Sequence, residues 1–515
     1  MATAQTRRLA GAAAIVMFAY VTSRLTGLLR DIAISYRFGT SPEFGAYVAA
    51  MQVPDLVFQV VAGAAVASAF IPVYLRYLTD ADQETGWQLV SNLFTLAFAV
   101  LIPLIAVVMV LTPVIMPIIV PDFLPQYQQM AANLARIVLL APLFFTIGSF
   151  STSLLNAHQR FFLAAVAPTC YNLGIICGAL VLSRWFGIYG LALGALLGSL
   201  CFLLVQIPGL RVIGLRFRPR LNLRDPGVLS VARLMGPRTL GLAVTQLNFF
   251  VAIYLASGIA GGVPALRYAW TLTMLPLGIF AMAIGTAIFP SLAEQNATEA
   301  FDEMRQTLVN SLRFIMYLTI PASIGLVVLS PAVVRLIYQR GMFDAHSTAL
   351  VAGALRFYAA GLLGMATIEI LARVFYAMHD TWTPVKTGTL GMAINLGLGL
   401  LLVRVMGLDG LALATAVAST VEATALFAIG RHRIAGLELR PLIDSAMLSF
   451  LGSLAMAATV VAVSQVDLPL QRILSGLLHV GLAIFVGGLV YLAATSTLGS
   501  PEVRQLRRML QQRIG

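Results

Sequence analysis

The amino-acid sequence predicts an all-α integral membrane protein with fourteen transmembrane helices. Two six-helix lobes in a pseudo-two-fold repeat, followed by two C-terminal helices, are the expected architecture. The composition, the spacing of apolar runs and an internal repeat predict it. Apolar residues make up 59% and charged residues 10% of the 515 residues, and the mean hydropathy is +0.90. Soluble domains carry about 25% charged residues, so this composition excludes a soluble fold.

Apolar runs are separated by polar breaks or by breaks that contain proline or glycine, and these runs define the expected spans. About 20 mostly apolar residues are enough to cross the hydrocarbon core of a bilayer. The spans are expected at residues 10–37, 43–77, 86–119, 126–157, 160–184, 188–209, 226–260, 263–294, 302–329, 346–378, 382–404, 408–430, 441–466 and 471–498.

Arginine clusters in certain loops indicate the orientation of the chain. They occur after the sixth and twelfth spans and in both tails, at Arg211, Arg216, Arg218, Arg220 and Arg224, at Arg431, Arg433 and Arg440, and at Arg7, Arg8, Arg504, Arg507, Arg508 and Arg513. Cytoplasmic loops of membrane proteins carry such an excess, so both termini are expected in the cytoplasm. The net charge of +12 therefore reflects membrane topology, and no nucleic-acid partner is expected.

The third observation is an internal repeat. The stretch SRWFGIYGLALG (183–194) matches VRVMGLDGLALA (403–414), and AFIPVYL (69–75) resembles AIFPSLA (287–293) at nearly the same offset. Two six-helix copies of the same orientation would place a site at the seam between them. The expected division is residues 1–220 for the first lobe, 221–435 for the second, and 436–515 for the last two helices and the basic tail.

The first span contains an unusual group of charges in SRLTGLLRD (23–31). On a helix Arg24 and Asp31 share a face, and Arg30 lies about 120° away from Arg24. Charged residues within spans face the protein interior or an aqueous cavity. Two hypotheses stay open: the arginines bind an anionic ligand, or an Arg–Asp pair holds this helix against a neighbour.

Arg267 and Asp55 are the other candidates for a binding cavity. Arg267 lies in the eighth span without an acidic neighbour in sequence, and Asp55 follows Pro54 in the second span. If the second and eighth spans correspond in the repeat, Arg24 and Arg267 would face one cavity from two lobes. Paired guanidinium groups suit a phosphate-rich ligand. The alternatives are an interfacial position for Arg267 and a structural role for Asp55.

Three further charges are candidates for coupling or structural roles. Glu369 and Arg373 are four residues apart in the tenth span and are expected to form a salt bridge. Glu422 in the twelfth span is either a group that couples transport to protons or cations, or a protonated packing residue. No nucleotide-binding loop, metal-ligand motif or nucleophile elbow occurs. We therefore expect no enzyme activity, catalytic residue, metal or cofactor, and uphill movement would draw on the membrane potential or a cation gradient.

Five stretches of the chain carry a family resemblance: SRLTGLLRD (23–31) with FG (38–39), VPDLVFQVVAGAAVASAFIPVY (53–74), MGPRTLGLAVTQLN (235–248), LPLGIFAMAIGTAIFPSLA (275–293) and FYAMHDTWTPVK (375–386). Together they resemble the MurJ/MviN lipid II flippase family of the multidrug/oligosaccharidyl-lipid/polysaccharide (MOP) exporter superfamily. The resemblance implies a two-lobed flippase with a cationic central cavity. It also implies that the helix-1 arginines, here Arg24 and Arg30, are important for function, and that the last two helices form a groove for the lipid tail.

The chain departs from the family pattern at two places. A basic pair and a following acidic residue of helix 2 fall on Phe58, Gln59 and Gly63 here. A family arginine of helix 8 falls on Thr271, whereas this chain carries Arg267 one turn earlier on the same face. The expected cavity is therefore less basic than the family pattern.

The resemblance implies movement of lipid II, an undecaprenyl-pyrophosphate-linked peptidoglycan precursor, from the inner to the outer leaflet by alternating access. The alternatives are a flippase for another polyprenyl-linked oligosaccharide, a cation-coupled exporter of the same superfamily, or a non-transporting membrane scaffold for envelope synthesis. The expected partners are the lipid-linked substrate and the bilayer of the bacterial inner membrane. The chain is expected to be a monomer, alone or together with cell-wall synthesis proteins.

Overall fold

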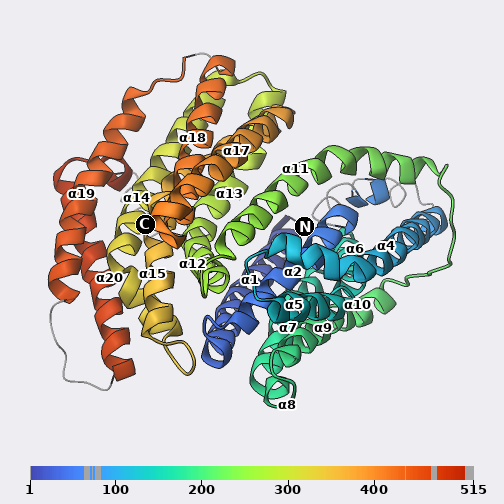
Figure 1. The fold of residues 1–515 in the computed structure, drawn as a ribbon. Coiled ribbons are helices and arrows are strands. Elements are labelled where there is room, and N and C mark those ends of the chain that lie inside the picture. Colours follow the sequence, from blue (N-terminus) through green and yellow to red (C-terminus); the bar gives the residue numbers. More distant parts are fainter. Residues whose placement is uncertain are drawn as a thin grey trace. The chain divides into compact units, whose positions relative to one another are not determined.

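The computed structural model describes residues 2–62, 70–71, 73–75, 83–434, 436–464 and 472–504, and every regular element in these ranges is a helix (Figure 1). Gly63, which the family pattern singles out, and the tail beyond Arg504 lie outside the described residues. The chain forms two compact units, one of residues 1–263 with 340–343 and the other of residues 264–339 with 344–515. The predicted lobe boundaries remain a prediction.

The first unit is a bundle of helices. Its elements are α1 (Ala2–Phe38), α2 (Pro42–Ala62), α4 (Gln83–Ile119), α5 (Pro125–Val138), α6 (Ala141–Ala157), α7 (Phe161–Cys177), the π-helical turn η1 (Gly178–Leu182), α8 (Ser183–Phe186), α9 (Ile188–Leu204), α10 (Ile207–Val212) and α11 (Pro226–Ala256).

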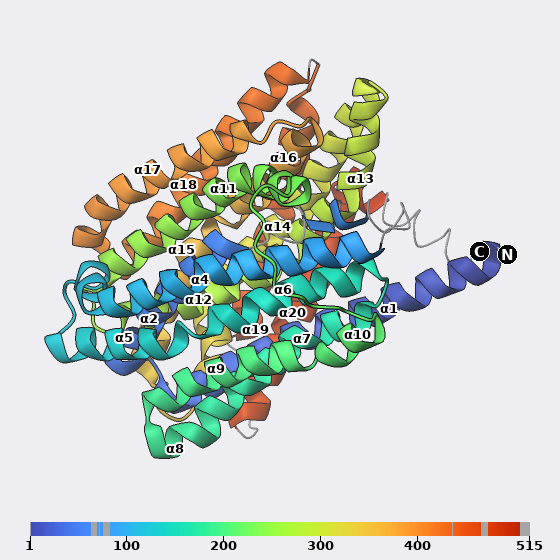
Figure 2. The same ribbon diagram turned by 90° about the vertical axis from the view of Figure 1, so that its right-hand side faces the viewer.

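The second unit is also a helical bundle, in which α17 and α18 lie side by side (Figure 2). Its elements are α12 (Gly262–Pro276), the π-helical turn η2 (Leu277–Met282), α13 (Ala283–Ala297), α14 (Phe301–Tyr338), α15 (Ala345–Ala360), α16 (Leu362–Ala377), α17 (Trp382–Met406), α18 (Leu408–Arg433), α19 (Arg440–Ser464) and α20 (Arg472–Thr497).

Eleven helical segments in the described ranges are long and apolar enough to cross a membrane, and α15 with α16 gives a twelfth if this pair, bent by 48°, is one span. These twelve overlap the second to sixth and the eighth to fourteenth predicted spans, and the last part of the second prediction, 43–77, falls largely outside the described residues. The remaining predictions, 10–37 and 226–260, fall on helices α1 and α11, which are not among the eleven. The all-helical membrane fold is confirmed, and the count of fourteen stays a prediction.

The longer of the two repeated stretches has the same local structure in both copies. Gly187 has φ 54° and ψ −133° before α9, and Gly407 has φ 59° and ψ −130° before α18. Only glycine adopts this backbone conformation at little cost. Three residues later, Gly190 and Gly410 each pack against backbone eight residues earlier in the chain. The sequence match therefore reflects a repeated helix–turn–helix junction.

Small residues let α7 with η1 pack closely against α9. A Cβ atom built on Gly178 would lie 2.6 Å from Cα of Gly194, so the two backbones touch. This close approach is typical of helices that associate through small residues within a membrane.

Gly194→Ala is expected to destabilise the protein by about 1–3 kcal/mol, because the added methyl group overpacks a backbone contact. Gly397→Ala is the matched control: its Cβ would meet no atom within 4 Å, and alanine favours a helix. Thermal unfolding in detergent measures both variants. Equal midpoints for the two would contradict the close packing of α9.

A buried carboxylate, Glu502, joins the segment that follows α20 to α14 and α19. Glu502 is 3% exposed, and its Oε1 lies 2.8 Å from Nη2 of Arg313. Ser445 and Ser500 donate hydrogen bonds to the two oxygens of Glu502, at 2.9 and 2.7 Å. Burial raises the pKa of Glu502, but these hydrogen bonds and the Arg313 charge outweigh it, so its pKa lies below the usual value.

Glu502→Ala is expected to cost about 3 kcal/mol of stability, since it leaves Arg313 without its counterion. The depressed pKa of Glu502 means that its contribution is complete above the unfolded-state value of about 4.3 and is lost as the pH falls through the lower folded-state value. Thermal unfolding of wild type and variant between pH 3 and pH 8 tests this. A stability difference that stays constant down to pH 3 would contradict the assignment.

Candidate functional site

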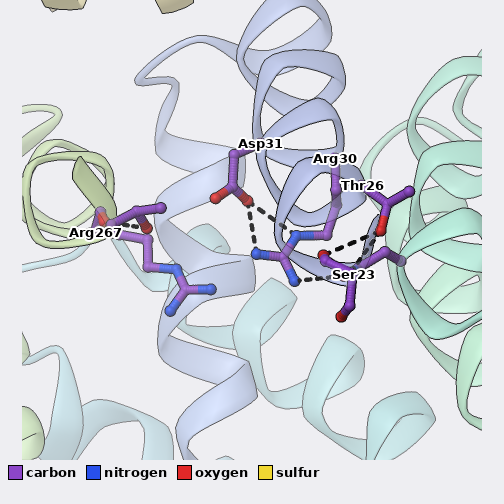
Figure 3. Close-up of polar contacts among 7 residues, drawn as sticks. Ser23, Thr26, Arg30, Asp31 and Arg267 are labelled. Carbon is purple, nitrogen blue, oxygen red and sulfur yellow. Dashed lines mark hydrogen bonds and ion pairs between the residues drawn. The ribbon is translucent and has the colours of Figure 1, made fainter. Parts of the chain in front are cut away.

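The charge cluster of α1 faces α7, which packs along it. The guanidinium of Arg30 contacts Asp31 Oδ1 through Nε and Nη2, both at 2.9 Å, and its Nη1 donates to Asn172 Oδ1 at 3.0 Å. Figure 3 shows Arg30 directed at Asp31 on one side and toward Ser23 and Thr26 on the other. Asp31 is 5% exposed, so this ion pair is largely removed from solvent.

Asn172 of α7 completes the connection between the two helices. Its Nδ2 donates to the Ser23 carbonyl at 3.1 Å and to Thr26 Oγ1 at 3.3 Å. Sequence reasoning missed Asn172, although a lone asparagine in the apolar fifth span was a signal. Such polar side chains commonly join helices within membranes.

The contacts of Arg30 and Asp31 match the hypothesis that an Arg–Asp pair holds this helix against a neighbour, while Arg24 lies in a different setting. Asp31 pairs with its sequence neighbour Arg30, even though the helical period puts Asp31 on the face of Arg24. The Arg24 side chain is exposed. It lies about 21 Å along the axis from the end of α1 at Phe38, by a rise of 1.5 Å per residue. An end at the membrane surface would put Arg24 within the core, which is about 30 Å thick.

Asp55 of α2 lines a pocket of about 450 Å³ inside the first unit, between α2, α5, α6 and α7. Phe58 and Gln59, which stand where the family pattern has its basic pair, line the same pocket. These two positions therefore present an aromatic ring and an amide to the pocket.

Arg267 lies on α12 of the second unit with an exposed side chain. Thr271, at the position where the resemblance predicts an arginine, donates a hydrogen bond to the Arg267 carbonyl at 3.0 Å. The two residues are therefore one helical turn apart. Arg24 and Arg267 belong to different units, and a shared cavity remains a prediction.

The predicted Glu369–Arg373 salt bridge is confirmed, with 2.5 Å between Oε2 and Nη1. Glu422 of α18 packs against a glycine of α17: a Cβ on Gly391 would lie 2.7 Å from Glu422 Oε2. Within the described ranges, no group of three or more histidine, cysteine or acidic residues could hold a metal ion. The chemistry that α1 offers is therefore the binding of a ligand by the exposed charge of Arg24.

The family model described as lipid II flippase MurJ matches residues 34–470. A probable lipid II flippase MurJ of Haemophilus influenzae is 30% identical over 424 residues, which cover 79% of this chain and 83% of that protein. The chain belongs to the MurJ family. The match includes the helix-2 region with Phe58 and Gln59.

Solved structures agree with this membership of the MurJ family at the level of the fold. A structure titled lipid II flippase MurJ, inward closed conformation, has a TM-score of 0.79 at 24% identity and covers 94% of this chain and 98% of its own. An inward-facing multidrug resistance MATE transporter of the MOP superfamily has a TM-score of 0.69 at 16% identity, with 81% and 95% covered. The chain is thus a multi-pass membrane protein of a flippase family, and the prediction that it is not an enzyme is confirmed.

Proposed function

We propose that this chain moves lipid II from the inner to the outer leaflet of the bacterial inner membrane by alternating access. Membership of the MurJ family, with a match over residues 34–470, carries the proposal. The exposed Arg24 of the first predicted span supports it, because an arginine within the hydrocarbon core needs an aqueous or anionic partner.

The mechanism requires no covalent step. Arg24 and Arg267 would hold the pyrophosphate, since guanidinium groups bind phosphate oxygens through paired hydrogen bonds. The Arg30–Asp31 pair with Asn172 would keep α1 fixed on α7, so that Arg24 is presented in a constant direction. The exposed apolar side chains of α19 and α20, among them Phe450, Leu454 and Phe485, suit contact with the lipid tail.

The proposal also includes the source of the energy that drives lipid II movement. Return of an empty, cation-lined site moves positive charge across the membrane, which is worth about 2.3 kcal/mol per charge per 100 mV. A cation gradient acting on Glu422 is the other source. The chain works as a monomer with both termini in the cytoplasm. It is connected to the enzymes of cell-wall synthesis through the cargo that they share.

Replacement of a bacterium's own lipid II flippase by this chain tests the function. Growth and the amount of lipid II accessible in the outer leaflet are measured after depletion of the host protein, with expression verified by immunoblot. We expect both to be restored. Normal membrane expression without accessible lipid II would contradict the proposal, and rescue confined to a strain lacking another glycan flippase would assign a different polyprenyl-linked cargo.

A further inference from the structure

The pocket beside Asp55 has a chemistry different from that of the α1 arginines. Its volume of about 450 Å³ lies in the range of small-molecule sites, which is about 300–1,000 Å³. It is lined by helices of the first unit only, so its walls are defined without reference to the second unit.

Three aromatic rings form one wall of the pocket. The Phe145 ring centroid lies 5.7 Å from that of Phe58 and 4.9 Å from that of Tyr171, the latter pair being edge to face at 74°. These mutual contacts fix the rings in place. Tyr171 precedes Asn172, whose hydrogen bonds tie this turn of α7 to α1.

The polar groups of the pocket select for positive charge. Asp55 contributes a carboxylate and Gln59 an amide, and none of its lining residues is lysine, arginine or histidine. A carboxylate repels a pyrophosphate, whereas a carboxylate next to aromatic faces attracts an ammonium group through charge and cation–π interaction. The Gln59 carbonyl oxygen is a second acceptor for N–H groups.

We propose that this pocket binds a protonated amine carried on an apolar or flexible body. The amine has two sources: the peptide part of the lipid-linked cargo, in which case the inference rests on the proposed function, or a free organic cation. In the first case the cargo is held at two points, its pyrophosphate by arginine and its amine by Asp55. In the second case the chain also binds small cations independently of lipid II.

Binding to the purified full-length protein tests the shared chemistry. The probe is benzyltrimethylammonium, and its neutral carbon isostere neopentylbenzene is the comparison. We expect saturable binding of the cation in preference to the isostere, and about tenfold weaker cation binding in Asp55→Asn, a change of about 1.4 kcal/mol. Tyr171→Leu is expected to weaken binding as well, whereas Tyr171→Phe keeps the ring and the affinity.

The matched control is Glu43→Gln in the first turn of the same helix, which removes one acid outside the pocket. Equal cation affinity in wild type and Asp55→Asn, with both proteins folded by thermal unfolding, would overturn the proposal. Because this assay uses no lipid II, its failure is distinguishable from a failure of the flippase assignment.

Translocation in vesicles separates the two sources. If the cargo supplies the amine, Asp55→Asn slows movement of native lipid II to the rate that wild type shows with N-acetylated lipid II. If the natural ligand is a free cation, acetylation has no effect on lipid II movement, and Asp55→Asn lowers uptake of radiolabelled benzyltrimethylammonium. Either pattern supports an amine site, and absence of both patterns contradicts it.

Discussion

Arg30→Met is expected to lower the stability of the protein by about 3 kcal/mol and to abolish most lipid II movement. The variant leaves the buried Asp31 carboxylate without its counterion, and removal of one partner of a buried ion pair is costly. It also removes the hydrogen bond that Arg30 donates to Asn172, one of three that join α1 to this residue. Thermal unfolding in detergent and the growth-rescue assay measure the two effects.

A double variant separates a structural role of Arg30 from cargo binding. Replacing both partners of a buried pair by groups of similar size is often nearly neutral, so Arg30→Met with Asp31→Asn is expected to regain most of the lost stability. Since we assign Arg30 to the contact with α7, flipping should return with stability. A stable double variant that does not move lipid II would show that Arg30 itself contacts the cargo.

Arg24→Ala is expected to lower lipid II movement with little effect on stability, in contrast to Arg30→Met. Its side chain is exposed, so the change in stability should stay within about 0.5 kcal/mol. Lipid II movement should fall by about 10- to 100-fold, because a charge-assisted hydrogen bond is worth about 1.5–3 kcal/mol. Arg24→Lys should recover part of the rate, since lysine keeps the charge without the planar fork.

Arg404→Ala is the control for this comparison, because Arg404 is an exposed arginine at the end of α17. Growth rescue and outer-leaflet lipid II are measured with matched expression. If Arg404→Ala lost as much activity as Arg24→Ala, a general effect of positive charge would replace the specific role of Arg24.

Much of the fold was predictable because its signals are local in sequence. Apolar runs define spans, and a spacing of four residues brought Glu369 and Arg373 together. The repeat around Gly187 and Gly407 was visible because a left-handed backbone conformation demands glycine in both copies. Each of these features depends on neighbours within about one helical turn or on a requirement for a single residue type.

The contacts between distant segments were not predictable in the same way. Asn172 lies 142 positions from Arg30, and Glu502 reaches Arg313 from a segment with no distinctive motif. Asp31 shares a helix face with Arg24 two turns away, and it is the long Arg30 side chain that reaches its sequence neighbour Asp31. The 48° bend between α15 and α16 also divides what looked like one continuous span.

The central claim is that α1 presents Arg24 to the pyrophosphate of the cargo. Its most direct test is translocation in vesicles by purified wild type and Arg24→Ala, with pyrophosphate-linked lipid II compared with a monophosphate-linked analogue of the same glycan and tail. The account predicts that wild type moves the pyrophosphate form faster and that Arg24→Ala erases this preference. An unchanged preference in folded Arg24→Ala protein would contradict it.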